Sequence, residues 1–264
     1  MGLLAAKLLL APLCVVAVSL AGRRWGVAAA GVLGGLPAVA APILLILTLI
    51  HGSSFGATAA ASTLLGLAAL TTFVVVYGRV APGAGPPAFT VIVGWLSFLL
   101  CVAVLSLFDP PPSLSLVVVG ACFAFGLMLL PAQAGTISPA SPPPWWDLPA
   151  RGLAALVLVV ALTAASGRLG PELSGLLAPF PIITSVLAVF THAHGGIDQV
   201  RVLLRNFLVG FYGYAAFCFV LAIGLTSLGV AAAFSLALVV AFAVQAASFA
   251  LRSWLVLAFA SRYP

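Results

Sequence analysis

The sequence predicts an all-α integral membrane protein, and three observations lead to this fold class. Hydrophobic residues make up 64% of the 264 residues and charged residues only 5%, whereas soluble domains contain about 45 to 50% apolar and about 25% charged residues. The mean hydropathy is +1.32. The apolar residues also form repeated runs of the length that a helix needs to cross a bilayer, roughly 20 residues. Little of the chain is left for a soluble domain.

We expect about nine transmembrane helices, with ends uncertain by several residues. A Pro-, Ser- and Gly-rich linker at 131–149 separates the fifth run from the sixth. The last twelve residues either extend the ninth helix or lie along the membrane surface. The nine expected spans are Leu3–Leu20, Val27–Ile50, Phe55–Tyr77, Ala88–Phe108, Ser113–Leu130, Pro149–Ala165, Glu172–His192, Val200–Leu225 and Val230–Leu251.

Two of these spans contain a similar Gly- and Pro-rich interruption. The first is GVLGGLPAVAAP, Gly31 to Pro42, and the second is GLLAPFPIITS, Gly175 to Ser185; Pro37 and Pro181 lie 144 positions apart. Proline inside a helix removes a backbone donor and clashes with the preceding turn, so each span should break there. A matched pair of broken helices is the best sequence indication of a transporter's binding site.

The same spacing of 144 residues relates further positions without gaps, which predicts an internal repeat. The odd fifth span makes the second copy begin on the opposite side of the membrane, so the two repeats should be inverted. We therefore divide the chain into a first four-helix repeat (1–110), a linking helix and loop (111–147) and a second, inverted four-helix repeat (148–264). The matched pairs are Gly52 and Gly196, Leu64 and Leu208, Gly66 and Gly210, Phe73 and Phe217, Val76 and Val220, and the basic pair Lys7 and Arg151.

The distribution of basic residues predicts the orientation. Seven arginines fall near one predicted face and two basic residues near the other, which by the positive-inside rule places the N-terminus outside and the C-terminus in the cytoplasm. The formal charge of +6 is not gathered in a basic arm or face, so we do not expect nucleic-acid binding. The seven are Arg23, Arg24, Arg79, Arg151, Arg201, Arg205 and Arg262, and the two are Lys7 and Arg168.

Lys7 and Arg151 are the first candidates for substrate binding. Each lies within the first turns of its predicted span, and the two enter from opposite faces. In one interpretation they bind an anionic group in a central cavity, helped by the positive ends of the broken helices. In the other they extend to the lipid headgroups and anchor the helix ends. Asp147, four residues before Arg151, either orients its guanidinium or caps the helix.

The residues of the two interruptions form the second candidate group. Glycine and proline there either shape a binding site or only improve helix packing, since both are frequent in membrane helices. The second copy adds two hydroxyl groups, which can contact a ligand or satisfy freed backbone groups. The candidates are Gly34, Gly35, Pro37, Pro181, Thr184 and Ser185.

The most polar stretch, His192 to Arg205, adds His192 and Arg205 to the candidate substrate site. Its arginines either bind a phosphate group or serve as a positive flank of the span. His192 and His194 are two positions apart and have no cysteine or acidic partner at metal-ligand spacing. We therefore expect no metal, and nothing in the sequence indicates a cofactor.

All four acidic residues fall at predicted span ends, so the carboxylate at mid-membrane that ion-coupled carriers commonly use is missing. Motifs of nucleophilic, metal-dependent or phosphate-binding enzymes are also missing. We expect no catalytic residues, although a lipid-modifying site built from His192 or His194 with Arg205 remains an alternative.

Several segments resemble a family of uncharacterised bacterial inner-membrane proteins, and the arrangement is similar in general to small inverted-repeat secondary transporters. The resemblance covers nearly the whole chain and implies a bacterial inner membrane, but it transfers no site residues. The segments that carry it are PWWDLPAR (Pro144–Arg151), GLLAPFPIITSVLAVFTH (Gly175–His192), LLRNFLVGFYG (Leu203–Gly213), GRRWG (Gly22–Gly26) and GLPAVAAPILL (Gly35–Leu45).

The sequence thus predicts a secondary carrier or lipid translocase that moves a small anionic or amphipathic substrate by alternating access. The alternatives are an intramembrane lipid-modifying enzyme and a non-transporting accessory subunit. The expected partners are the lipid bilayer, the substrate and a second copy of the chain in a homodimer.

Overall fold

The computed structural model describes residues 2–83, 86–131, 143–166 and 171–260, with side chains for 9–83, 86–131, 143–161, 172–248 and 250. Every regular element in this part of the chain is an α-helix, which confirms the all-α part of the predicted fold class. The helices are α1 (Gly2–Trp25), α2 (Val27–Gly34), α3 (Ala40–His51), α4 (Ser53–Val80), α5 (Pro87–Leu105), α6 (Pro112–Leu129), α7 (Asp147–Ser166), α8 (Pro171–Leu177), α9 (Ile182–Leu228) and α10 (Val230–Ala260).

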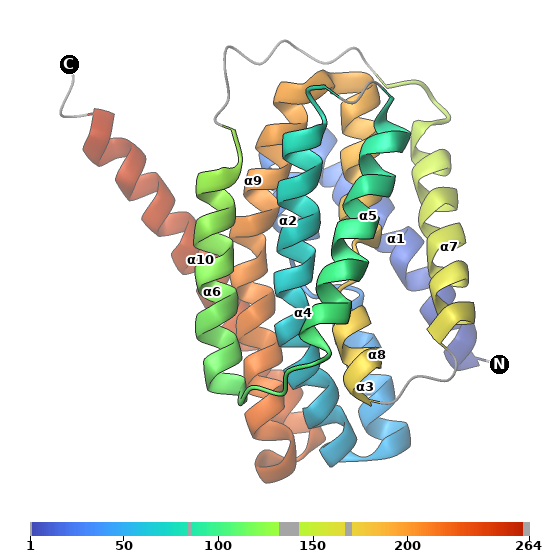
Figure 1. The fold of residues 1–264 in the computed structure, drawn as a ribbon, viewed down its shortest axis with the longest axis vertical. Helices are drawn as coiled ribbons and strands as arrows, with labels where there is room; N and C mark the ends of the chain where they lie inside the picture. The colour runs from blue at the N-terminus through green and yellow to red at the C-terminus, as the bar shows by residue number, and fades with distance from the viewer. Residues whose placement is uncertain (1, 84–85, 132–142, 167–170, 261–264) are drawn as a thin grey trace.

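The helices form one bundle with their axes roughly along its long direction (Figure 1). Five helical segments of the described chain are long and apolar enough to cross a membrane. They are Ser53–Val80, Pro87–Leu105, Pro112–Leu129, Glu172–Leu228 and Val230–Ser248. The C-terminal segment continues as helix α10 as far as Ala260.

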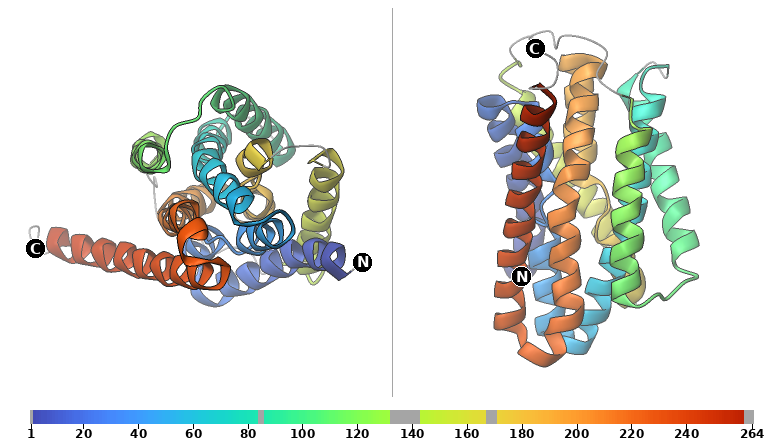
Figure 2. Two further views of the ribbon diagram at one scale, coloured as in Figure 1. Left: turned by 90° about the horizontal axis from the view of Figure 1, so that it is seen from below. Right: turned by 90° about the vertical axis from the view of Figure 1, so that its left-hand side faces the viewer.

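Helices α4 and α9 form the centre of the bundle, with α1, α5, α6, α7 and α10 around the outside (Figure 2). In the most apolar 18-residue stretch of each helix, 72% is buried in α4, against 28% in α5 and 22% in α6. The outer helices expose large apolar side chains such as Leu100 and Met128, at 69% and 80%. Such wide apolar surfaces are what a lipid-facing helix presents, because lipid tails are themselves apolar.

Both predicted helix breaks are confirmed. Helix α2 ends at Gly34 and α3 begins at Ala40, while α8 ends at Leu177 and α9 begins at Ile182. The part of the seventh predicted span that follows the second break and the whole eighth span belong to one element, α9, which reverses direction at Gly196. Gly196 has φ 74°, and Gly52 at the α3–α4 turn has φ 91°. Residues other than glycine rarely adopt a backbone conformation with positive φ, so both reversals require glycine.

The first break is closed by two short backbone hydrogen bonds. The amide of Ala38 donates to the carbonyl of Leu36 at 2.8 Å, and the amide of Ala41 donates to the carbonyl of Pro37 at 2.8 Å. The chain therefore turns sharply before α3 begins.

The second break has the same two hydrogen bonds, each 144 residues further along. The amide of Ile182 donates to Phe180 at 2.7 Å, and the amide of Ser185 donates to Pro181 at 2.8 Å. Different side chains thus give the same local backbone path, because a proline is the central residue of the turn in each case.

Each broken helix packs backbone to backbone against a central helix. A Cβ atom added at Gly31 of α2 would lie 2.5 Å from the carbonyl oxygen of Leu203 in α9, and one at Gly175 of α8 would lie 2.5 Å from that of Ala59 in α4. Real Cβ atoms do not approach other atoms this closely. Glycine at these positions therefore allows the helices to approach, as small residues do in membrane helix packing.

The central helices contribute glycines of their own to the same two contacts. A Cβ atom at Gly66 of α4 would lie 2.6 Å from the carbonyl oxygen of Leu176, and one at Gly210 of α9 would lie 2.6 Å from that of Val32. Both the glycines and the carbonyls are 144 residues apart. The contact of α2 with α9 is therefore the counterpart of the contact of α8 with α4.

Candidate functional site

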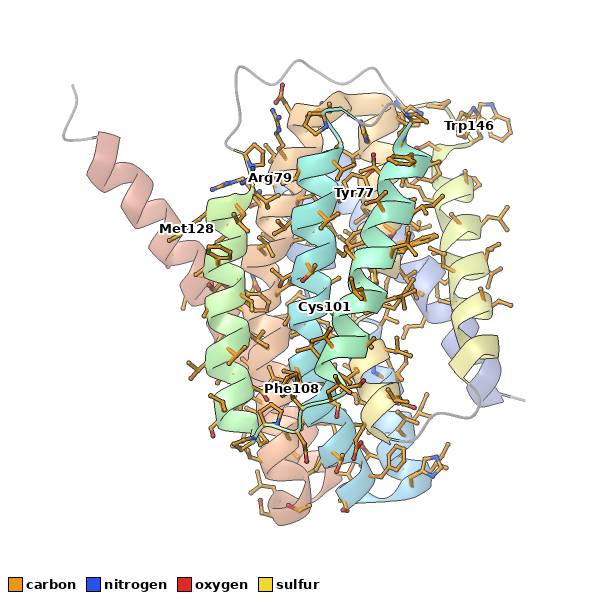
Figure 3. The ribbon with its side chains drawn as sticks, viewed as in Figure 1. Tyr77, Arg79, Cys101, Phe108, Met128 and Trp146 are labelled. Carbon is orange, nitrogen blue, oxygen red and sulfur yellow. The ribbon has the colours of Figure 1, made fainter. Side chains whose placement is uncertain are left out.

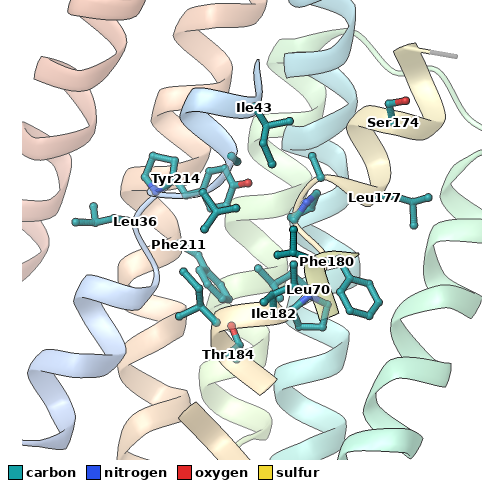
Figure 4. A pocket seen from close by; sticks show the side chains of 18 of the residues that line it. Leu36, Ile43, Leu70, Ser174, Leu177, Phe180, Ile182, Thr184, Phe211 and Tyr214 are labelled. Atoms are coloured by element: carbon teal, nitrogen blue, oxygen red, sulfur yellow. The ribbon is translucent and has the colours of Figure 1, made fainter. Parts of the chain in front are cut away.

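A cavity of about 360 Å³ lies where the two broken helices meet. Four of the sequence-predicted residues line it: Gly34, Pro37, Pro181 and Thr184. Figure 4 shows the break between α2 and α3 and the break between α8 and α9 on either side of the side chains that line the cavity. The volume of the cavity lies within the range of small-molecule binding sites, which is usually about 300–1,000 Å³. Both interruptions therefore lie at one place in the fold.

The wall of the cavity is mainly apolar. Leu36, Ile43, Leu177 and Phe180 are among the side chains that line it, and no lining residue of the described chain is Asp, Glu, Lys or Arg. Phe180 is held in place by aromatic contacts with Trp95 and Phe98, with ring centroids 5.9 and 5.4 Å away.

The cavity extends from the two breaks toward the end of the bundle at which α3 meets α4. His51, Phe55 and Ser174 line that part, and His51 is exposed. The ring of His51 stacks on Phe55 with centroids 4.5 Å apart. In the opposite direction, toward the end of the bundle at which α7 starts, residues 185–188 of α9 are buried. The cavity is therefore closer to one end of the bundle than to the other.

Tyr214 of α9 lines the cavity and is a candidate residue that the sequence analysis missed. Its side chain is 6% exposed, and its hydroxyl has no hydrogen-bond partner among the described residues. The hydroxyl points toward the enclosed space in Figure 4. The residue at the matched position of the first half is Leu70, which also lines the cavity. A tyrosine aligned with a leucine was the signal in the sequence that could have identified it.

Gly35 and Ser185 lie beside the cavity but have other contacts. A Cβ atom at Gly35 would lie 2.7 Å from the Cα atom of Gly210, so Gly35 serves the packing of α2 on α9. The hydroxyl of Ser185 accepts a hydrogen bond from Nε1 of Trp95 at 2.8 Å. Neither residue is among those that line the cavity.

Arg151 lies away from the cavity in a cluster of charged groups. The predicted contact with Asp147 is confirmed: Nε of Arg151 donates to Oδ2 of Asp147 at 2.9 Å, and Arg23 of α1 donates to the same oxygen at 2.8 Å. The guanidinium of Arg151 also lies over the ring of Phe190, 5.0 Å from its centroid. The side chain of its predicted counterpart, Lys7, lies outside the described residues.

The Asp147 carboxylate is buried. It lies at the start of α7, before the apolar part of that helix. Burial alone would raise the pKa of this carboxyl, but the hydrogen bonds and charges of Arg151 and Arg23 outweigh that effect and hold its pKa below the ordinary value. Nδ1 of His194 lies 3.7 Å from the other carboxylate oxygen. The cluster, which we call the Asp147 cluster, therefore joins α1, α7 and the first segment of α9.

His192 and Arg205 lie apart from each other and from the cavity. Nδ1 of His192 lies 3.4 Å from the hydroxyl of Tyr77 in α4. Arg205 donates to the carbonyls of Leu127 and Leu130, at 2.9 and 3.0 Å, at the end of α6. These carbonyls have no partner within the helix, so the arginine caps α6.

Arg79 also reaches the end of α6, where its Nε donates to the carbonyl of Leu129 at 2.6 Å. The other arginine of the polar stretch, Arg201, pairs with Asp198 at 2.9 Å. No group of three or more His, Cys, Asp or Glu side chains in the described ranges is placed to hold a metal ion.

Comparison with known proteins gave no match: no family model fits the chain, and no similar curated protein or solved structure was found. The resemblance to bacterial inner-membrane proteins therefore stays a prediction.

Proposed function

We propose that the protein is a membrane carrier, either a secondary transporter or a lipid translocase, that moves a small anionic or amphipathic substrate by alternating access. The observation that carries this proposal is the cavity bounded by both helix breaks. Transporters commonly bind their substrates near mid-membrane between two discontinuous helices. The cavity's mainly apolar wall suits an amphipathic substrate better than a highly charged one.

The proposal includes nine membrane crossings arranged as two inverted repeats. In it, α2 with α3 forms one broken crossing, α8 with the first segment of α9 forms another, and the rest of α9 crosses back. Helix α6 links the repeat α1–α5 to the repeat α7–α10. Support comes from the matching hydrogen bonds at the two breaks and from the matching glycine contacts of α2 with α9 and of α8 with α4.

We further propose that the end of the bundle that carries the Asp147 cluster faces the cytoplasm of a bacterial cell, with the N-terminus outside. Arg23, Arg151 and Asp147 meet there, and Figure 3 shows Arg79 at the same end as Trp146. Arginines gathered at one end fit the positive-inside rule, and Trp145 and Trp146, which are 89% and 46% exposed, suit a membrane interface.

In this orientation the cavity approaches the outside, so the structure would represent an outward-facing state. The Asp147 cluster would then hold the cytoplasmic side together, since it joins the first segment of α9 to α1 and α7. Transport would require these contacts to open while the outer end closes. The inverted repeats provide a mechanism, because the two halves exchange conformations.

The experiment measures side-specific labelling of single cysteines. The four free cysteines, Cys14, Cys101, Cys122 and Cys218, are first replaced by alanine or serine. Ile43→Cys then reports on the cavity and Ala188→Cys on the closed side, where the alanine is fully buried. We expect an impermeant maleimide to label position 43 from outside and position 188 more slowly from the cytoplasmic side.

Ala69→Cys in the buried centre of α4 is the control and should stay unlabelled from both sides. If position 188 behaves like position 69, the bundle does not alternate and the carrier proposal fails. An accessory subunit would give that result.

The alternative of a lipid-modifying enzyme requires His192 or His194 to act together with Arg205. The three side chains are engaged at separate places: His192 with Tyr77, His194 with Phe190 and Asp147, and Arg205 with the end of α6. This arrangement does not favour the enzyme. The homodimer stays a prediction.

A further inference from the structure

Two helices begin at the cavity. Val39 and Ala40 at the start of α3, and Ile183 and Thr184 at the start of α9, all line it. The first amides of a helix have no acceptor within that helix, and its N-terminus carries a partial positive charge of roughly half an elementary charge. Both N-terminal ends therefore present hydrogen-bond donors to the same space.

The carbonyl oxygens next to these helix starts already accept hydrogen bonds. Leu36 and Pro37 accept hydrogen bonds within the first break, and Phe180 and Pro181 accept them within the second. The turn geometry thus satisfies acceptors that would otherwise attract a cation. Each of these bonds also uses one amide, but the amides of Ala40, Ile183 and Thr184 donate to no backbone carbonyl of the described chain. These three amides favour a ligand that accepts hydrogen bonds.

The Tyr214 hydroxyl is an independent indication of a ligand. It is enclosed, has no partner among the described residues and points toward the cavity. A buried hydroxyl without a partner is unfavourable, so one that faces a cavity points to a ligand that accepts its hydrogen bond. A phenol donates one hydrogen bond readily, which adds a third donor to those of the two helix ends.

The rest of the wall limits what this ligand can be. Leu36, Ile43, Leu177 and Phe180 offer only apolar surface. With no Lys or Arg among the lining residues of the described chain, two partial helix charges suit one negative charge but not several. The ligand therefore carries a single acceptor group on an apolar body.

We propose, on the basis of the carrier function above, that the substrate is a monocarboxylate with an apolar body. Its carboxylate accepts hydrogen bonds from the Tyr214 hydroxyl and from the amides of Ala40 in α3 and of Ile183 and Thr184 in α9. Its body packs against Leu36, Ile43 and Phe180. The second half of the chain alone supplies the side-chain hydroxyls, since Leu70 and Ala40 stand at the positions that match Tyr214 and Thr184. This difference gives the site one polar side.

The test compares two probes that share one carbon skeleton, 3-phenylpropanoate and 3-phenylpropan-1-ol. The full chain is reconstituted in lipid nanodiscs, and each probe competes with radiolabelled 3-phenylpropanoate, with empty nanodiscs subtracted. We expect the carboxylate to bind about tenfold or more tightly than the alcohol, because hydrogen bonds to a charged acceptor are about twice as strong as neutral ones. Equal binding, or no binding of the carboxylate, would overturn the proposal.

Tyr214→Phe should weaken carboxylate binding about tenfold and leave the alcohol nearly unchanged. The matched control is Tyr212→Phe, which removes a hydroxyl that contacts the carbonyl of Gly120, outside this cavity. Unchanged carboxylate binding in Tyr214→Phe would remove this residue from the site. Should that variant not fold, the comparison of the two probes on the natural chain still decides.

The outcome separates this inference from the carrier proposal. If the cysteines at positions 43 and 188 show alternating access but 3-phenylpropanoate does not bind, only the substrate class is wrong. If it binds and position 188 stays closed, the ligand site stands and the carrier function fails.

Discussion

Arg23 and Asp147 are 124 residues apart in the chain, yet their side chains meet at 2.8 Å. Arg23 lies in the last turn of α1 and Asp147 in the first turn of α7. A carboxylate at a helix N-terminus and a guanidinium at a helix C-terminus also suit the partial charges of those ends. Because Arg151 binds the same carboxylate oxygen, one acid holds two arginines together.

Asp147→Asn should destabilise the protein. Asparagine keeps the shape of the side chain but removes the charge that balances the two arginines. Removing one member of a buried ion pair costs about 3–5 kcal/mol, but the Arg23 side chain is 36% exposed, so we expect about 1–3 kcal/mol. The measurement is the midpoint of thermal unfolding in detergent.

The control is Asp198→Asn, which breaks the pair of Arg201 with an acid that is 46% exposed. Such an exposed pair contributes little, about 0–1 kcal/mol. If both variants melt at the same temperature as the natural chain, the Asp147 cluster does not stabilise this end of the bundle.

The Asp147 carboxylate should make the stability of the protein depend on pH in the acidic range. Because the pKa of Asp147 is lowered in the folded protein, its contribution is fully present above the ordinary value of 3.8 and is lost as the pH falls through the lower pKa of the folded state. The difference in melting temperature between the natural chain and Asp147→Asn should therefore be constant at neutral pH and shrink below pH 3.8. A difference that grows with acid would contradict the assignment.

Gly66→Ala and Gly210→Ala should have similar effects if the repeats are real. Each added methyl group would lie 2.6 Å from a backbone carbonyl oxygen of the opposing broken helix. A backbone atom cannot move aside as a flexible side chain can, and overpacking of this kind costs about 1–3 kcal/mol. Thermal unfolding of the two variants gives the comparison.

Gly120→Ala on α6 is the matched control, because a Cβ atom there has no neighbour within 4 Å. It should be neutral or slightly stabilising, since alanine favours the helix over glycine by about 1 kcal/mol. A large effect at only one of Gly66 and Gly210 would count against the repeat.

The helix breaks could be predicted from sequence because proline acts locally. The breaks at Pro37 and Pro181 lie where the sequence placed them, although Pro12 lies inside α1 without ending that helix. Their meeting at one cavity also followed from the matched spacing. The helix ends near Gly196 were harder to predict from the sequence, since one glycine reverses α9 without a long loop.

The partners of the charged residues could not be predicted. The contact of Arg151 with Asp147 is local and followed from the spacing of four residues, but the contact with Arg23 depends on how α1 packs against α7. Tyr214 was missed for a related reason. Its importance comes from a hydroxyl left without a partner in a packed interior, and composition gives no information on that.

Thr184 and Ser185 are adjacent hydroxyl residues for which the structure predicts opposite consequences. Thr184 lines the cavity, whereas the hydroxyl of Ser185 accepts the Trp95 hydrogen bond at 2.8 Å. Thr184→Val should weaken binding of 3-phenylpropanoate with little change in melting temperature. Ser185→Ala should leave the indole N–H of Trp95 without its partner and lower stability by about 1–3 kcal/mol, with binding nearly unchanged. Each variant is the other's control, because both remove one hydroxyl from the same turn of α9. If both change only stability, Thr184 belongs to the packing of the break and the polar side of the cavity reduces to Tyr214 and the helix ends.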